Sequence, residues 1–151
     1  MNNNIQAYAK IKGSFSYPDI HGTVTFSQLK DGIIVTAKVY NLPYTKCEKE
    51  IYGFHMHEGM SCTGNDTDPF ADAKTHYNSG DCSLHPYHTG DMPPLFGNNG
   101  FAYMSYFTNK FSISEIIGKA IIIHDSVDDF TTQPSGNSGQ KIACGIITAT
   151  A

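Results

Sequence analysis

The stretch IQAYAKIKG, residues 5–13, sets the class of fold, because its apolar and polar side chains alternate. Successive side chains of a β-strand point to opposite faces, so a period of two predicts a strand with one buried face. The side chains expected on that buried face are those of Ile5, Ala7, Ala9 and Ile11.

The same alternation returns twice further along the chain. Residues 21–29 (HGTVTFSQL) and 32–42 (GIIVTAKVYNL) each predict a strand, and KDG at 30–32 predicts the turn between them. The side chains expected to point inward are Val24, Phe26, Val35, Ala37 and Val39.

The rest of the regular structure is also predicted to be mainly β. Further strands are expected at residues 50–57, 100–107, 118–125 and 141–150. The helix candidate is SISEII at 112–117, where Ser112 or Ser114 would cap a single turn. Short alternating strands in this number predict an all-β fold, namely an antiparallel Greek-key sandwich or barrel.

Length and charge narrow the class of protein. A chain of 151 residues is predicted to form a single domain, 1–151. Its net charge of -4 argues against a nucleic-acid partner or an anionic membrane, since both need a basic face. The sequence shows neither a long apolar run nor a signal peptide, so no membrane partner is expected. A cytoplasmic protein is the default expectation, and an exported mature form is the alternative.

Two long stretches interrupt the β pattern. Residues 58–100 contain no convincing strand, and residues 125–141 form a second irregular run rich in Gly, Ser and Asp. Loops this long are uncommon in compact domains unless they are functional or disordered. The first loop carries three histidines and two cysteines, so we expect something to hold it in place.

The motif HMH, residues 55–57, is the first candidate for chemistry. Side chains two apart on a strand point the same way, so His55 and His57 could bind a single ion together. The alternative is a pair of exposed imidazoles on one side of a sheet, because short motifs give many false matches.

A second cluster lies in the loop sequence HYNSGDCSLHPYHTGD, residues 76–91. It contains His76, His85, His88 and Asp91. Three imidazoles and one carboxylate make a complete tetrahedral set for zinc, and a bound ion would stabilise the loop. The alternative is a solvated loop that is merely rich in histidine.

His124 ends an apolar run, where a lone histidine is more often structural than a metal ligand. Together with the two clusters, however, it makes six histidines and one aspartate, more than one ion can use. This number suits two neighbouring ions that share one imidazole. All-nitrogen tetragonal coordination is preferred by copper, and a tetrahedron of three histidines and one aspartate by zinc.

Five motifs occur in the order and approximate spacing of a known family. They are GFHMHE, THYN, HTGD, IIIHD followed by DDF, and SGNSGQKIACGII. On these motifs the chain resembles the copper,zinc superoxide dismutases from about Ile5 to Ile147, as a bacterial-type member with shortened loops. The resemblance implies an eight-stranded antiparallel Greek-key barrel or sandwich with two long functional loops.

The resemblance also implies a set of site residues. Copper would be bound by His55, His57, His76 and His124, and zinc by His76, His85, His88 and Asp91, with His76 as the bridge. Asp128 would link His55 to His85 and so fix the orientation of their rings. Cys62 and Cys144 would form the disulfide that anchors the long loop to the last strand.

The implied activity is antioxidant: superoxide would be converted to dioxygen and hydrogen peroxide while copper cycles between Cu(II) and Cu(I), with zinc in a structural role. The expected cofactors are therefore Cu and Zn, and the expected partner is the superoxide anion. His76 and Lys141 are the expected catalytic residues. Members of the family often pair, which makes a homodimer a candidate assembly.

This sequence also departs from the family. Lys141 stands where the family normally has arginine; lysine keeps the charge but lacks the planar fork that binds an anion through two contacts, so slower or less selective turnover is expected. The loop from Phe130 to Lys141 is shorter than usual, which predicts weaker electrostatic guidance. His85 and His88 are unusually close in sequence, so their individual zinc positions are less defined than the set.

Two alternatives stay open at the level of sequence. The same residues could store or deliver copper, or bind zinc alone, without catalysis, and a sandwich domain could bind metal adventitiously.

Cys47 and Cys82 match none of the five motifs; they could form a second disulfide, stay as free thiols, or place Cys82 as a competing zinc ligand. His21 is expected to be a plain surface residue.

Overall fold

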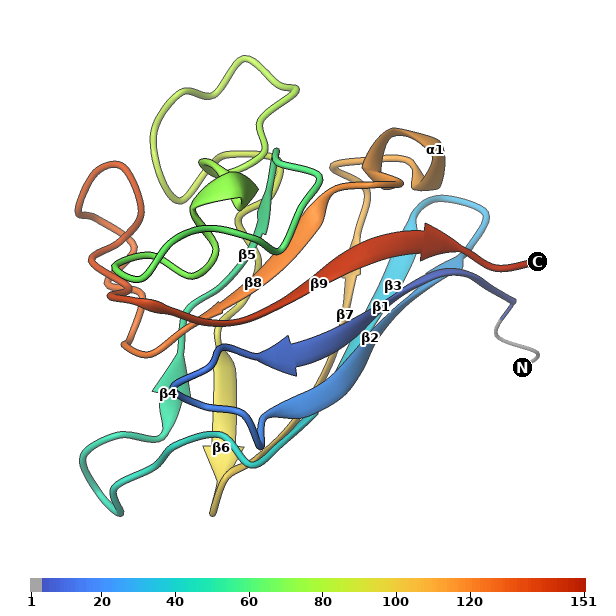
Figure 1. Cartoon of the computed structure of the whole chain (residues 1–151). Coiled ribbons are helices and arrows are strands. Elements are labelled where there is room, and N and C mark those ends of the chain that lie inside the picture. The colour runs from blue at the N-terminus through green and yellow to red at the C-terminus, as the bar shows by residue number, and fades with distance from the viewer. Residues whose placement is uncertain (1–3) are drawn as a thin grey trace.

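The computed structural model describes residues 4–151 and shows an all-β fold. Nine strands form one antiparallel sheet that curls into a nearly closed barrel (Figure 1). The strands are β1 Ile5–Gly13, β2 His21–Gln28, β3 Ile33–Tyr40, β4 Ile51–Tyr52, β5 Phe54–His57, β6 Leu95–Asn98, β7 Phe101–Thr108, β8 Ala120–His124 and β9 Lys141–Ala149, with a 3-10 turn η1 at Ala71–Ala73 and a helix α1 at Ile113–Ile116. The predicted fold class is confirmed, with one strand more than the eight expected.

The order of the strands explains the closure. Along the sheet they run β4-β6-β7-β3-β2-β1-β9-β8-β5, so β3 and β7 are neighbours although they are far apart in sequence. The connections from β3 to β4 and from β7 to β8 are therefore crossovers, as in Greek-key folds. β4 and β5 lie at opposite ends of the sheet but are consecutive in the chain, and this joins the two edges of the barrel.

Gly53 is the reason that one predicted strand, residues 50–57, became two. Its amide donates to Ser126 O and its carbonyl accepts from the amide of His124. A β-carbon at this position would lie 2.7 Å from the side chain of Ser138. The strand is interrupted at Gly53, where the chain changes its pairing partner: β4 pairs with β6, and β5 pairs with β8.

The alternating strands form the core as predicted. The five side chains expected to point inward from β2 and β3 are fully buried, as are those of Ala7, Ala9 and Ile11 in β1. Ile5 is the exception: it was expected on the buried face but is 42% exposed, because it lies at the outer end of the strand.

Strand β6 was missed by the sequence, which had no convincing strand over residues 58–100. It is only four residues long, follows two prolines, and exposes Phe96 while burying Leu95. The available signal was the turn after it: Asn99 and Gly100 both have positive φ and connect β6 to β7 in a tight hairpin.

The helix candidate is confirmed as α1. Ser112 is the residue that caps it, and Ser112 and Glu115 form a capping box, in which each side chain bonds the other residue's backbone. No helix in the described part of the chain is long and apolar enough to cross a membrane. The single domain predicted for 1–151 stays a prediction, and residues 1–3 lie outside the described range.

The two long loops gather on one side of the barrel, over β5, β8 and the start of β9 (Figure 1). Here the loop after β5 covers a small second core, formed by Phe70, Ala73, Ala120, Ile122 and Cys144. β8 is thus buried on both faces, under the loop and over the barrel interior, which explains why it is apolar at nearly every position.

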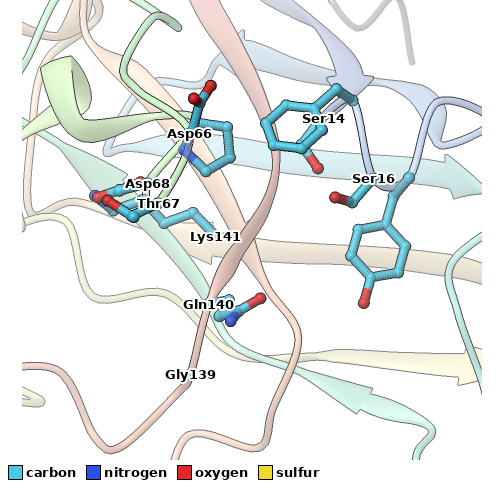
Figure 2. Close-up of a pocket in the computed structure, with 11 residues that line it drawn as sticks. Ser14, Ser16, Asp66, Thr67, Asp68, Gly139, Gln140 and Lys141 are labelled. Atoms are coloured by element: carbon cyan, nitrogen blue, oxygen red, sulfur yellow. The ribbon is translucent and has the colours of Figure 1, made fainter.

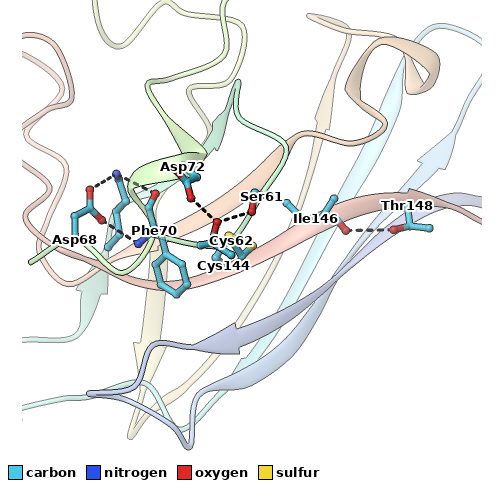
Figure 3. Close-up of a disulfide and its surroundings, with 10 residues drawn as sticks. Ser61, Cys62, Asp68, Phe70, Asp72, Cys144, Ile146 and Thr148 are labelled. Atoms are coloured by element: carbon cyan, nitrogen blue, oxygen red, sulfur yellow. Dashed lines mark hydrogen bonds and ion pairs between the residues drawn. A yellow bond between two sulfur atoms is a disulfide. The ribbon is translucent and has the colours of Figure 1, made fainter. Parts of the chain in front are cut away.

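A disulfide ties this loop to the barrel. Cys62 in the loop is bonded to Cys144 on β9 with a Cα–Cα distance of 5.8 Å (Figure 3). This is the pairing that the family resemblance implied. Cys47 and Cys82 are exposed free thiols, so the second disulfide considered from sequence is not formed.

Candidate metal centre

The first group of possible ligands sits at the free edge of β5. His55 and His57 come from β5 itself, and the loop after it pairs along the same edge, with isolated bridges from His57 to His76 and from His55 to Asp91. Because β8 lies on the other side of β5, its last residue, His124, reaches the same place. One nitrogen from each of His55, His57, His76 and His124 lies within 4.8 Å of the others.

A second group lies beside the first and centres on the carboxylate of Asp91. His76 Nδ1 is 2.7 Å from one carboxylate oxygen, and the Nδ1 atoms of His85 and His88 are 3.1 and 3.0 Å from the other. The four ligand atoms within 4.8 Å of one another are those of His55, His76, His85 and Asp91. His88, which the sequence predicted as a zinc ligand, thus joins this group through Asp91.

Six imidazole nitrogens in these groups are buried without a hydrogen-bond partner. They are His55 Nδ1, His57 Nε2, His76 Nε2, His85 Nδ1, His88 Nδ1 and His124 Nε2. Leaving a buried polar atom unpaired costs about 1–3 kcal/mol, so six such atoms in one place call for a ligand. A metal ion coordinated by these nitrogens would satisfy them, and the residues present therefore fit a metal centre.

The contacts of Asp91 with His85 and His88 also indicate a metal centre. Both nitrogens lie close to the carboxylate, yet neither contact has hydrogen-bond geometry. Short distances with poor alignment are expected where nitrogen and oxygen atoms face a common centre rather than each other. These two nitrogens are therefore unpaired and are not held in ion pairs with Asp91.

The other nitrogen of each ring has a partner that fixes the ring's orientation. His57 Nδ1 bonds Lys74 O at 2.8 Å, and His124 Nδ1 bonds Gly139 O at 3.2 Å. Such outer hydrogen bonds hold the free nitrogen toward a bound metal. His57 and His124 are thus pre-oriented by the backbone of the two loops.

Asp128 connects the two groups. Its carboxylate is buried and accepts from His55 Nε2 and His85 Nε2, both at 2.7 Å, and from the amide of Phe130 at 2.8 Å. The position is made possible by Gly136, where a β-carbon would overlap this carboxylate and lie 2.6 Å from His85 Nε2. The sequence placed Asp128 between these same two rings.

Electrostatics favour the metal-binding forms of these side chains. Burial lowers the pKa of His57 well below its ordinary value and that of His124 to about 3, so both rings are neutral and have a free lone pair. Burial raises the pKa of Asp91, but the hydrogen bond from His76 and the neighbouring imidazoles outweigh it and hold that pKa at about 2. Asp91 is therefore an anion.

A pocket of about 560 Å³ opens over the histidines. Its lining includes His57, His76 and His124, together with two cationic side chains, Lys74 and Lys141. A small anion in this pocket would meet both the imidazoles and positive charge.

Comparison with known proteins supports the interpretation of this geometry. Residues 20–147 match the family described as copper/zinc superoxide dismutase (SODC). The chain belongs to the copper/zinc superoxide dismutase family. Its resemblance in five motifs is therefore confirmed over most of the chain.

Individual proteins of the family are also similar to this chain over most of its length. A copper-zinc superoxide dismutase from Deinococcus radiodurans is 32% identical over 147 residues, which cover 86% of this chain and 78% of the relative. Another from Legionella pneumophila is 32% identical over 133 residues, covering 83% and 76%. Both relatives are bacterial.

Solved structures agree on the fold. The Cu/Zn superoxide dismutase from Brucella abortus has a TM-score of 0.77 at 25% identity, covering 93% of this chain and 99% of that one. A double mutant of a superoxide-dismutase-like protein from Bacillus subtilis has a TM-score of 0.76 at 26% identity, covering 93% and 96%.

Within this family fold, Lys141 is not a free cation. Its Nζ lies 2.7 Å from Asp68 Oδ2 and 3.4 Å from Phe70 O, and the side chain extends from β9 toward Asp68 (Figure 2). The sequence placed Lys141 near the histidines as the charge that attracts the substrate. The ion pair reduces the positive charge that Lys141 contributes to the pocket.

Two further sequence expectations concern His21 and Cys82. His21 is exposed and stacks on Tyr40, away from both groups, as expected of a surface residue. Cys82 is in neither group of possible ligands among the described residues. The sequence did not single out Lys74 as a residue of this site. Its place beside the histidines depends on the conformation of its backbone, which no sequence pattern indicates.

Proposed function

We propose that this chain is a superoxide dismutase, which converts two superoxide anions and two protons to dioxygen and hydrogen peroxide. The observation that carries the proposal is the convergence of six unpaired, buried imidazole nitrogens on two adjoining groups, which have His55 and His76 in common. The proposed cofactors are those that the family uses, copper and zinc.

The proposed copper ligands are His55, His57, His76 and His124. They offer four imidazole nitrogens and no carboxylate, which suits copper. The proposed zinc ligands are His76, His85, His88 and Asp91, a tetrahedral set of the kind that zinc prefers. His76 is proposed as the bridge because its Nε2 faces the first group and its Nδ1 lies at Asp91.

Copper, when bound, supplies a centre that accepts one electron from a first superoxide and returns it to a second. The side chains supply the rest. His76 Nε2 can hold a proton while Nδ1 stays on the zinc side, and it can release that proton to the reduced product. Asp128 keeps His55 and His85 in one orientation throughout, so neither ring turns when charge changes beside it.

Metal content and turnover test this proposal together. Purified protein reconstituted with both metals is expected to bind two ions per chain and to accelerate superoxide decay above the rate of the same amount of aqueous copper. His124→Ala should lower copper content and abolish turnover while leaving zinc bound. His21→Ala is the matched control, because His21 is exposed and lies outside both groups.

Two outcomes would contradict the proposal in different ways. If the protein binds two metal ions but shows no turnover, the non-catalytic alternative remains, namely metal storage or delivery. The pairing of Lys141 with Asp68 favours that alternative. Retention of copper by His124→Ala would contradict the proposed ligand set.

Assembly and surroundings belong to the same proposal. We propose a homodimer, because members of the family often pair. We also propose that it binds neither membrane nor nucleic acid, because its net charge is -4. Sedimentation equilibrium of the metal-loaded protein tests the dimer, and a mass that stays that of one chain at micromolar concentration would contradict it.

A further inference from the structure

Lys74 has a backbone conformation that lysine rarely adopts. It follows η1 with φ 61° and ψ −142°, close to a region that only glycine normally occupies. A β-carbon makes this conformation unfavourable, and such strain persists only where the surrounding structure imposes it.

The backbone of Lys74 has a clear role that does not need a lysine. Its carbonyl accepts the hydrogen bond from His57 Nδ1 at 2.8 Å, which orients that ring, and its amide donates to Ala71 O at 3.1 Å. Glycine would make both bonds without strain. The side chain of Lys74 therefore calls for a separate explanation.

The side chain lines the pocket over the histidines and is exposed to solvent. Within residues 4–151, no carboxylate lies within 4.0 Å of its ammonium group. The other cation of the pocket, Lys141, is paired with Asp68 at 2.7 Å. Glu58 also lines the pocket, and its carboxylate accepts from the hydroxyl of Thr75 at 3.2 Å.

We propose that Lys74 is the cation that guides superoxide into the pocket, a role that the sequence assigned to Lys141. This inference rests on the proposed function. A chain with a net charge of -4 repels an anion at long range, so an unpaired positive charge inside a concave site is needed to reverse the local field. Lys74 is in that position, and its charge explains why a strained lysine stands where glycine would fit.

Three substitutions separate charge from backbone strain. Lys74→Arg keeps the positive charge and the backbone strain. Lys74→Gln removes the charge and keeps the strain. Lys74→Gly removes both the charge and the strain. Lys30→Gln is the matched control, because it removes the same charge from an exposed turn that does not line the pocket.

Two readouts are measured on the copper- and zinc-loaded protein, at ionic strengths of about 0.01 and 1 M. The first is kcat/KM for superoxide, and the second is the affinity for azide, a small anion whose binding is followed by absorption. At low salt, Lys74→Gln and Lys74→Gly should lower both quantities roughly two- to fivefold, while Lys74→Arg and Lys30→Gln stay near the parent. The differences should vanish at high salt, where the Debye length is about 3 Å.

Thermal unfolding adds a readout of opposite sign. Lys74→Gly should raise the midpoint by roughly 2–4 °C because it relieves strain, whereas Lys74→Gln should leave it unchanged. A gain in stability with a loss of anion affinity distinguishes a guiding charge from a structural residue.

The outcomes separate this inference from the proposed function. Unchanged azide affinity of Lys74→Gln at low salt would overturn the role of Lys74 whatever the turnover. Copper-loaded protein that binds azide in a Lys74-dependent way but lacks turnover would contradict the proposed function and keep the anion-guiding charge. A chain that takes up no copper would contradict both.

Discussion

Single residues near the two proposed metal sites are constrained by space as much as by chemistry. Asp128 can accept from His55 and His85 at once only because Gly136, with φ 70°, leaves room for its carboxylate. The two imidazoles are oriented by this one carboxylate. Glycine is thus required at position 136 for its small volume and for its backbone conformation.

Replacing Gly136 with alanine should therefore affect stability and zinc binding together. We expect the free energy of unfolding to fall by about 2 kcal/mol, because the new β-carbon meets Asp128 and the backbone is left-handed. Zinc affinity should fall as His85 loses its fixed orientation. Urea unfolding of the metal-free protein and a competitive zinc titration measure the two effects.

Gly80→Ala is the control for this substitution. The atoms nearest to a β-carbon at Gly80 lie 3.8 Å away, in ordinary contact. Its stability and zinc affinity should match those of the parent. If Gly136→Ala bound zinc as tightly as the parent, Asp128 would not be needed to orient His85.

At the scale of elements, the important arrangement is a loop fastened to a barrel. The loop after β5 pairs along the free edge of β5, packs Phe70 and Ala73 on the outside of β8, and is bonded to β9 through Cys62. These contacts place His76 and Asp91 beside the histidines of β5 and β8. The strands provide fixed positions, and the loop provides the remaining ligands.

Removing the disulfide should loosen this loop. The bond closes a sequence separation of 82 residues, for which the chain-entropy estimate is about 4.5 kcal/mol of stabilisation. We expect the double substitution Cys62→Ser, Cys144→Ser to lower the free energy of unfolding by roughly that amount and to weaken metal binding. Urea unfolding and metal titration provide the measurements.

The chain contains its own control for this experiment. Cys47 and Cys82 are exposed free thiols, so changing both to serine should leave stability within about 0.5 kcal/mol of the parent. An equal effect of the two double substitutions would show that the link between Cys62 and Cys144 does not anchor the loop.

At the scale of the whole molecule, the barrel has its own core, whereas the metal site contains unpaired buried nitrogens. The barrel core is formed by apolar side chains from the strands and needs no ion. The site instead gathers histidines with unpaired nitrogens and an anionic Asp91 from distant parts of the chain. Metal binding should therefore stabilise the loops more than the strands.

Metal removal tests this division. Chelation should lower the free energy of unfolding, by about 4 kcal/mol relative to protein in free metal at a thousand times the dissociation constant. Amide exchange should accelerate in residues 58–94 and 125–140, while the strand amides of β1 to β3 stay protected. Uniform acceleration over the whole chain would instead show that the barrel depends on the ions.

Much of the site was predictable because its residues lie in motifs. The candidate ligands follow from sequence, and the structure brings most of those side chains together. The bridging position of His76 is implied by the family resemblance and stays a proposal. The sequence missed β6, where four residues are too few to show a period. It treated residues 50–57 as one strand because the interruption at Gly53 depends on the distant loop residues Ser126 and Ser138.

The sequence by itself determined the all-β fold, the buried faces of its first three strands and the set of histidines, because alternation and residue chemistry are local properties. Only the tertiary structure decided which charges remain free. Asp68 and Lys141 are 73 residues apart, and their ion pair depends on how a loop folds over β9. The same fold imposes the left-handed backbone of Lys74 and leaves its charge unpaired in the pocket, since an electrostatic field depends on distances in space rather than along the chain.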